Sequence, residues 1–326
     1  MTPCLLDVTL REAGIVNNFS FSIAQIQAIV TALDQAGIDI IEVGYFRPKQ
    51  TTSTGNSCSP QYLDMVKSCC QHAALSIMVH ISDVPLNSYH DLAKYGISLV
   101  RFAVNPHYIA ENPHYISKLS KHTEAVLNAG LKFTLNVVRA SEVPPDVLVL
   151  AALTAQKLGA RCFYLADSNG SLYPKQIELS AQLLRSHTTI ALGLHTHDNL
   201  RLAFYNTLVA LDNGFEWIDA SLGGSGKGGG NLVSELIAGY LSLNFGRSYD
   251  VRELARAYSS SVVPTIGDEI SDYICSIISG LLDLNIDQID KIKLESKLRK
   301  TSFVELLFQH FKINLNSDRS IERFKI

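Results

Sequence analysis

Short apolar runs alternate with amphipathic segments along most of the chain. The runs are nearly continuous in apolar residues, which is typical of parallel strands that are covered on both faces. Between the runs, apolar residues recur at the spacing of one helical face, as in Ile26, Ile29 and Leu33. Gly37 ends this predicted helix. We predict strands at residues 4–10, 38–45, 74–81, 97–104, 131–138, 161–166, 189–195 and 216–222.

Eight strand–helix units within about 240 residues favour one α/β fold, the (β/α)8 TIM barrel, over an open doubly wound sheet. The alternation stops near Asn244. Residues 250–326 have helical periodicity, first in an apolar part and then in a charged part. We therefore predict a barrel at residues 1–243 and a helical C-terminal extension at 244–326, which would act as a cap or an oligomerisation element.

Two histidines stand two residues apart at the end of an apolar run. Alternate residues of a strand project to the same side, so His195 and His197 would point into one space. Two imidazoles and a carboxylate suit a divalent cation with open positions for water or substrate. Glu12, just after the first predicted strand, is the best placed carboxylate. Two ordinary histidines and a surface acid are the alternative interpretation.

Polar residues gather at the carboxyl ends of the other predicted strands, where the active site of such a barrel lies. Those with expected roles beside the metal are Arg11, Glu42, Tyr45, His80, Asn136, Arg139 and Asp167. Arg11 could stabilise an oxyanion with its fixed charge, or it could form a structural ion pair with Glu42 or Asp167. We expect Glu42, Asn136, Arg139 and Asp167 to contact substrate.

A glycine-rich loop at residues 223–231 follows the last predicted strand. It lacks the G-x-x-x-x-G-K-[ST] spacing of a phosphate-binding P-loop. We interpret it as a close-approach loop that brings Asn231 toward the site and leaves Lys227 exposed at its tip.

Charge and cysteine content exclude several classes of protein. The chain has 28 Lys and Arg against 31 Asp and Glu, a near balance that gives no reason to expect nucleic acid or a membrane as a partner. Its 6 cysteines form no C-x-x-C motif, which is typical of reduced thiols in the cytoplasm. No leader segment and no apolar stretch of about 18 residues is recognisable, so we expect a soluble cytoplasmic protein.

Three stretches together resemble a known superfamily. They are the run Asp7-Val8-Thr9-Leu10-Arg11-Glu12, the run from His195 to Asn199, and the pair Gly230-Asn231 with Glu235 beyond it. Their order and spacing resemble those of the DRE-TIM metallolyases. Residues 5–22 are most similar to the branch of the 4-hydroxy-2-oxovalerate aldolases.

This resemblance implies a metalloenzyme that forms or cleaves a C–C bond beside a chelated carbonyl. It assigns Glu12, His195, His197 and Asn231 as metal ligands. It assigns Arg11 to the enolate. The implied cofactor is Mn²⁺ or Mg²⁺, with Zn²⁺, Co²⁺ or Fe²⁺ as alternatives. The implied partners are a 2-oxo acid, an aldehyde, a second copy in a homodimer and an aldehyde dehydrogenase.

The chain departs from the family pattern at three positions. Glu12 stands where the family has an aspartate, one methylene shorter, and Ile15 stands where the aldolases have a histidine or tyrosine near the reacting proton. Ser225 stands where the CoA lyases have a reactive cysteine. Because isoleucine cannot transfer a proton, the base must be another group, and the candidates are His80, Tyr45 and Tyr273.

Three functions follow from these observations. The first is a metal-dependent aldolase that joins a pyruvate-type donor to an aldehyde. The second is a Claisen-type acyltransferase that joins acetyl-CoA to a 2-oxo acid at the same kind of site. The third is a catalytically decayed barrel that acts as a binding or partner subunit, which the replacements at Glu12 and Ile15 motivate.

Overall fold

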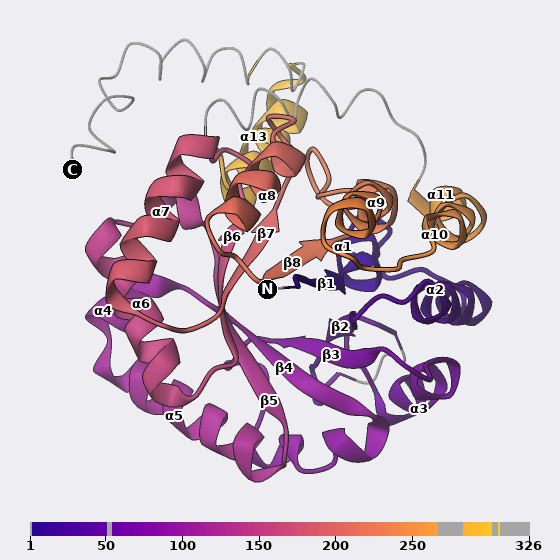
Figure 1. Cartoon of the computed structure of the whole chain (residues 1–326), viewed down its shortest axis with the longest axis horizontal. Helices are drawn as coiled ribbons and strands as arrows, with labels where there is room; N and C mark the ends of the chain where they lie inside the picture. The colour runs from indigo at the N-terminus through magenta and orange to yellow at the C-terminus, as the bar shows by residue number, and fades with distance from the viewer. Residues whose placement is uncertain (1, 51–53, 267–282, 302–305, 307–326) are drawn as a thin grey trace.

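The structure is a computed structural model that describes residues 2–50, 54–266, 283–301 and 306. Parallel strands form a closed barrel in the order β1 to β8, with helices around it (Figure 1). The strands are β1 Cys4–Asp7, β2 Ile40–Tyr45, β3 Ala74–Val79, β4 Ile97–Val104, β5 Lys132–Val137, β6 Cys162–Asp167, β7 Leu192–Thr196 and β8 Trp217–Ala220. The predicted (β/α)8 barrel is confirmed.

Helices cover the outside of the barrel, and proline at the first helical position starts five of them, α3 to α7. The helices are α1 Thr9–Val16, α2 Ile23–Gln35, α3 Pro60–Cys69, α4 Pro106–Glu111, α5 Pro113–Asn128, α6 Pro145–Leu158, α7 Pro174–His187, α8 Ala203–Asp212, α9 Ser234–Asn244, α10 Val251–Ala257, α11 Val263–Ile266 and α13 Ile286–Arg299. No helix in the described ranges is long and apolar enough to cross a membrane.

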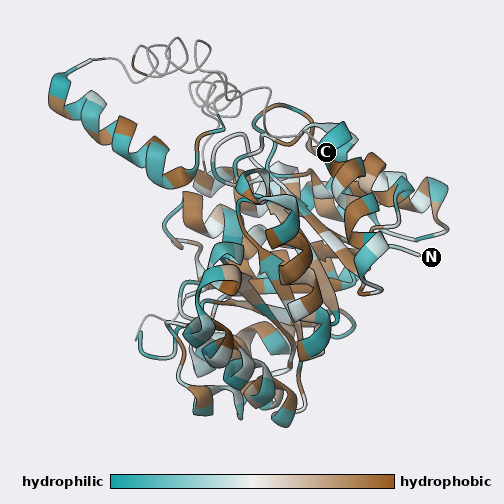
Figure 2. Ribbon diagram, turned by 90° about the vertical axis from the view of Figure 1, so that its left-hand side faces the viewer, coloured by the Kyte–Doolittle hydropathy of each residue, from teal (hydrophilic) through white to brown (hydrophobic). Residues whose placement is uncertain are grey.

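The apolar core lies mainly between the strands and the surrounding helices. Figure 2 shows the apolar residues on the strands and on the inward helix faces, with polar residues outside. A second, small cluster of Leu6, Val8, Ile40 and Leu99 fills the inside of the barrel below the site. Packing on both faces explains why the strands read as continuous apolar runs.

The first strand is shorter than the sequence predicts. It ends at Asp7, and α1 begins at Thr9. Asp7 accepts hydrogen bonds from the Thr9 backbone N–H and the Ser234 hydroxyl, both at 2.8 Å, which stabilises a turn at this point. The apolar pattern continues past the turn because α1 is itself largely buried. Arg11 and Glu12 therefore lie on a helix that crosses the barrel end.

The part of the C-terminal segment that the structure describes is helical, as predicted. Helix α10 packs against α2 and α9, and the Gln25 side chain donates a hydrogen bond to the Ser261 carbonyl at 3.3 Å. The residues just before α13 reach the rim of the barrel, where Asp283 accepts a hydrogen bond from Asn169 at 2.9 Å. The boundary at residue 243 stays a prediction.

Candidate metal centre at the carboxyl end of the barrel

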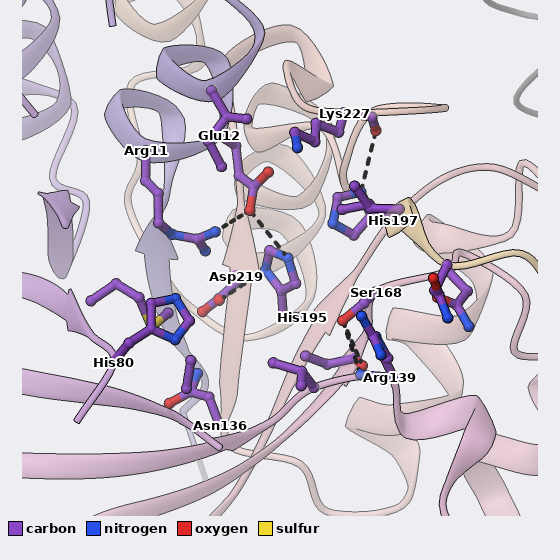
Figure 3. A pocket seen from close by; sticks show the side chains of 18 of the residues that line it. Arg11, Glu12, His80, Asn136, Arg139, Ser168, His195, His197, Asp219 and Lys227 are labelled. Carbon is purple, nitrogen blue, oxygen red and sulfur yellow. Dashed lines mark hydrogen bonds and ion pairs between the residues drawn. The ribbon is translucent and has the colours of Figure 1, made fainter. Parts of the chain in front are cut away.

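A cavity of about 270 Å³ opens at the carboxyl ends of the strands. It is closed on one side by Asn285 and Ile286, which come from the segment at the start of α13. The residues with predicted roles that line it are Arg11, Glu12, Tyr45, His80, Asn136, Arg139, His195 and His197 (Figure 3). Tyr273 lies outside the described residues.

Glu12, His195 and His197 form the centre of this cavity. Each offers one ligand atom, and the three atoms lie within 4.8 Å of one another. Strand β7 supplies His195, the turn after it supplies His197, and the first turn of α1 supplies Glu12. All three side chains are buried. This arrangement can hold a divalent cation and leave positions open for a ligand.

A hydrogen bond from Nδ1 orients each of the two imidazoles. His195 Nδ1 lies 3.0 Å from Asp219 Oδ2, and His197 Nδ1 lies 3.3 Å from the Lys227 carbonyl oxygen. Because both acceptors are oxygens, each Nδ1 carries a proton, which leaves Nε2 as the ring atom that can bind a cation. The Nε2 atom of His195 lies 3.6 Å from Glu12 Oε1 (Figure 3).

The protonation states of these groups favour cation binding. Burial raises the pKa of Glu12, but the charges of Arg11, His197 and His195 outweigh burial and lower that pKa to about 2. Burial lowers the pKa of His197 to about 4, against a smaller raising effect of Glu12. Glu12 is therefore ionised and His197 neutral near pH 7, as metal ligands must be.

Asn231, next to His197, offers one further oxygen atom. Its backbone forms a bridge with that of His197, and its side-chain amide donates to the Ser225 carbonyl at 3.0 Å. The Oδ1 atom is buried and has no hydrogen-bond partner among the described residues. Because an unsatisfied buried oxygen is costly, this atom fits the role of a further ligand to a divalent cation.

A network of buried ion pairs lies beneath the histidines. Arg11 contacts both Glu12 and Glu42. Arg101 contacts Glu42 Oε2 at 2.8 Å and Asp219 Oδ2 at 2.6 Å. Both oxygens of Glu42 are thus occupied by arginines, and Glu42 is fully buried. The predicted substrate contact of Glu42 is wrong, because this carboxylate holds two guanidiniums below the cavity.

The predicted role of Asp167 is also corrected. Asp167 is buried, and its oxygens accept hydrogen bonds from the backbone N–H groups of Ser171 and Leu172, both at 3.1 Å. These bonds order the turn after β6. Asp167 is not among the cavity-lining residues, so it does not contact a substrate there.

Arg101 and Asp219 belong to the network of buried ion pairs but are not among the residues predicted from the sequence. Both lie inside apolar strands, Arg101 in ISLVRFAV and Asp219 in WIDA. A charged residue within a continuous apolar run was a usable signal, because charged side chains are rarely buried without a partner.

The opposite wall of the cavity holds two candidate bases. The rings of Tyr45 and His80 stack with centroids 5.7 Å apart. Burial lowers the pKa of His80 and raises the pKa of Tyr45. His80 is therefore a neutral base near pH 7. Ile15 lines the same cavity and offers no proton.

Asn136 and Arg139 line the cavity from β5 and the turn after it. The Thr134 hydroxyl donates to Asn136 Oδ1 at 2.6 Å, which leaves the amide N–H groups for a ligand. Arg139 has a positive φ of 56° and pairs with Asp287 at 2.5 Å, so it ties the start of α13 to the barrel rim.

The position of the Lys227 side chain differs from the one predicted from the sequence. Lys227 is half-buried and lines the cavity. The sequence pattern predicts it exposed at the tip of the loop. Two hydrogen bonds hold the glycine loop against the segment after β7. The Asp198 backbone N–H donates to the Gly230 carbonyl at 2.9 Å, and the Asn199 side-chain Oδ1 accepts from the Gly229 N–H at 3.1 Å. This fold turns Lys227 toward the site.

Comparisons with known proteins place the chain in a family. The sequence model of the HMGL-like family matches residues 2–259. A 4-hydroxy-2-oxovalerate aldolase from Chloroflexus aurantiacus is 30% identical over 268 residues, which cover 80% of this chain and 76% of the relative. An oxaloacetate decarboxylase from Mycobacterium tuberculosis is 28% identical over 242 residues, which cover 73% of this chain and 70% of the relative.

A solved structure shares the fold. The N-terminal domain of a candidate aldolase from Bacteroides vulgatus superposes with a TM-score of 0.74 at 24% identity. The match covers 91% of this chain and 99% of that domain.

Proposed function

Because this chain belongs to the HMGL-like family, we propose that it is a divalent-metal-dependent aldolase. It forms or cleaves the C–C bond between the enolate of a pyruvate-type 2-oxo acid and an aldehyde. The observation that carries this proposal is the convergence of Glu12, His195, His197 and Arg11 on one cavity. Fixed ligands and a fixed positive charge are what enolate formation requires.

Glu12, His195 and His197 would hold the cation, and Asn231 would complete its protein ligands. The proposed cation is Mn²⁺ or Mg²⁺, with Zn²⁺, Co²⁺ or Fe²⁺ as alternatives, since the oxygen ligands suit the first two ions and the imidazoles suit the others. When bound, the cation polarises the keto oxygen of the 2-oxo acid as a Lewis acid.

Arg11 lies beside Glu12 and is held by Glu42, so its guanidinium is fixed before substrate binds. In this position it stabilises the negative charge that develops on the enolate oxygen. A preorganised charge of this kind needs no rearrangement during the reaction.

His80 is the proposed base, and Tyr45 is the alternative. In the cleavage direction the base takes the proton of the C4 hydroxyl, and the C3–C4 bond breaks. The bond electrons pass to the enolate, and the aldehyde leaves. A proton then returns to C3 to give the 2-oxo acid. The neutral state of His80 matches this task because burial lowers its pKa.

The oxaloacetate decarboxylase relative supports a second candidate reaction, in which the same enolate forms by loss of CO₂. A Claisen-type acyltransferase using acetyl-CoA remains the next alternative. The catalytically decayed barrel is disfavoured, because hydrogen bonds that the two histidines donate to Asp219 and to the Lys227 carbonyl still orient both imidazoles.

The partners follow from the same proposal. They are a small 2-oxo acid and an aldehyde, a second copy of the chain in a homodimer, and a dehydrogenase that takes the aldehyde. We assign residues 1–243 to the catalytic barrel and 244–326 to the extension that meets other subunits. Neither a nucleic acid nor a membrane is among the proposed partners, and the proposed location is the cytoplasm.

The test is deuterium exchange of the pyruvate methyl group in D₂O, followed by NMR with Mn²⁺ present. Exchange requires only the enolate, so the aldehyde need not be known. We expect exchange in the wild type and its loss in His195→Ala, in His197→Ala and after chelation. His114→Ala, at an exposed position of α5, is the matched control and keeps exchange. Exchange that survives complete chelation would contradict the proposal.

A further inference from the structure

The glycine loop places one long side chain, Lys227, in the cavity wall. Gly228 and Gly230 have positive φ values of 62° and 83°, so the backbone there favours glycine. A Cβ on Gly229 would lie 2.6 Å from the Asp198 carbonyl oxygen. Glycine is thus required around Lys227, and the loop presents a single basic side chain to the site.

The backbone of Lys227 is fixed relative to the metal centre. Its carbonyl oxygen accepts a hydrogen bond from His197 Nδ1 at 3.3 Å. The next turn of the loop is anchored by Asn199, whose Oδ1 accepts from the Gly229 N–H at 3.1 Å. Figure 3 shows the Lys227 amine on the same side of the cavity as Glu12. A ligand of the metal centre therefore lies within reach of this side chain.

The buried charges in the wall of the cavity and beneath it are almost balanced. The buried network consists of two guanidiniums and three carboxylates, namely Arg11, Arg101, Glu12, Glu42 and Asp219. It has one negative charge in excess. A divalent cation turns this into one positive charge, which the carboxylate of a 2-oxo acid neutralises.

The remaining cavity cations are Arg139 and Lys227. Arg139 is balanced by Asp287 at 2.5 Å. The Lys227 amine has no ion-pair partner within the part of the chain that the structure describes. A half-buried ammonium without a counter-charge is unfavourable, so this position favours a second anionic group on the ligand.

We infer that Lys227 is a specificity-determining residue and that the substrate is a 2-oxo acid with a second carboxylate at its far end. This inference deepens the proposed function and rests on it, because the first carboxylate and the keto group would occupy the metal centre. The Lys227 ammonium binds the distal carboxylate, and a substrate with an uncharged end lacks this contact.

The test is calorimetric binding to the Mn²⁺-loaded full chain of two ligands of equal length, 2-oxoglutarate and 2-oxopentanoate. They differ in the distal carboxylate, so their Kd ratio reports that group alone. We expect the diacid to bind about 10- to 100-fold more tightly, as for a charge-assisted hydrogen bond. Lys227→Met is expected to abolish the preference, and Lys227→Arg is expected to keep most of it.

Lys157→Met is the matched control. Lys157 is exposed near the C-terminal end of α6, which lies at the opposite end of the barrel from the site. It is expected to keep the wild-type ratio. Equal binding of both ligands by the wild type, or a diacid preference that persists in Lys227→Met, would overturn the inference.

The pyruvate exchange assay separates failure of this inference from failure of the proposed function. Metal-dependent exchange without a diacid preference overturns only the inference. A diacid preference that depends on Lys227 supports the inference, and absence of exchange in the same Mn²⁺-loaded protein overturns the proposed pyruvate chemistry.

Discussion

Two arginines share Glu42 but lie in different surroundings. Arg11 contacts Glu12 and Glu42 and lines the cavity. Arg101 contacts Glu42 and Asp219, is fully buried and is not among the lining residues. We call Arg11, Glu12, His195 and His197 the ligand layer. We call Glu42, Arg101 and Asp219 the support layer, of which Asp219 alone also lines the cavity.

The comparison shows that similar ion pairs serve different tasks. In the support layer, Arg101 touches only protein groups, and its guanidinium lies 4.5 Å from the Tyr164 ring centroid. It is the only guanidinium that Asp219 contacts among the described residues, and it is the second one on Glu42 beside Arg11. In the ligand layer, Arg11 uses the same partner, Glu42, and leaves part of its guanidinium toward the cavity. Substitution of Arg101 and substitution of Arg11 should therefore impair two different properties of the protein.

The largest effect is expected on stability, from Arg101→Met. This change leaves Asp219 without its guanidinium partner and Glu42 with Arg11 alone, and breaking a buried pair in this way costs about 3–5 kcal/mol in the free energy of unfolding. Urea unfolding followed by circular dichroism measures the loss. Arg101→Lys, which keeps the charge, should lose less. A stability of Arg101→Met within about 1 kcal/mol of the wild type would erase the distinction between the layers.

Arg11→Met should act on the reaction. Removing one preorganised charge from a developing oxyanion lowers kcat by about 10²- to 10³-fold. The rate of pyruvate methyl exchange measures this, and Mn²⁺ binding by the variant shows that the metal ligands are still in place. Exchange at the wild-type rate would mean that Arg11 is only a structural partner of Glu42.

Asp219→Asn tests the contact between the layers. Asp219 holds His195 Nδ1 at 3.0 Å, and loss of such a partner typically lowers metal affinity about 10- to 100-fold. Titration with Mn²⁺ followed by electron paramagnetic resonance gives the Kd. Asp39→Asn is the control, because Asp39 pairs with Arg247 at the other end of the barrel. Unchanged affinity in Asp219→Asn would show that the layers are independent.

The smallest effect concerns a buried pair remote from both layers. His122 Nδ1 lies 2.8 Å from the Tyr89 hydroxyl, and burial lowers the pKa of His122 to about 4. Between pH 4 and the ordinary histidine pKa of about 6.5, the unfolded chain binds more protons at this residue, so stability falls as the pH falls. His122→Gln keeps a hydrogen-bonding side chain and should flatten this part of the profile. An identical pH profile in wild type and variant would exclude His122 as a cause.

Much of the ligand layer could be predicted because it depends on local pattern. The pair His195 and His197 follows from strand alternation at the end of an apolar run. Glu12 follows from its place after the first strand, although the structure puts it on helix α1. The eight strands follow from their apolar runs, since both faces of the sheet are covered.

The support layer could not be predicted in the same way because its contacts join distant strands. Glu42 and Arg101 are 59 residues apart, and Arg101 and Asp219 are 118 residues apart. Which carboxylate meets which arginine depends on strand register and on rotamers inside the barrel. Glu42 and Asp167 were assigned to substrate because both follow the pattern of strand-end polar residues. That pattern does not distinguish a cavity-facing carboxylate from one beneath the cavity floor.

The central claim is that the ligand layer binds a divalent cation. Anomalous diffraction from crystals soaked in Mn²⁺ tests it most directly. We expect a strong peak between Glu12, His195 and His197, at about 2.0–2.3 Å from each ligand atom. A peak elsewhere, or no peak between these three side chains at saturating Mn²⁺, would contradict the account.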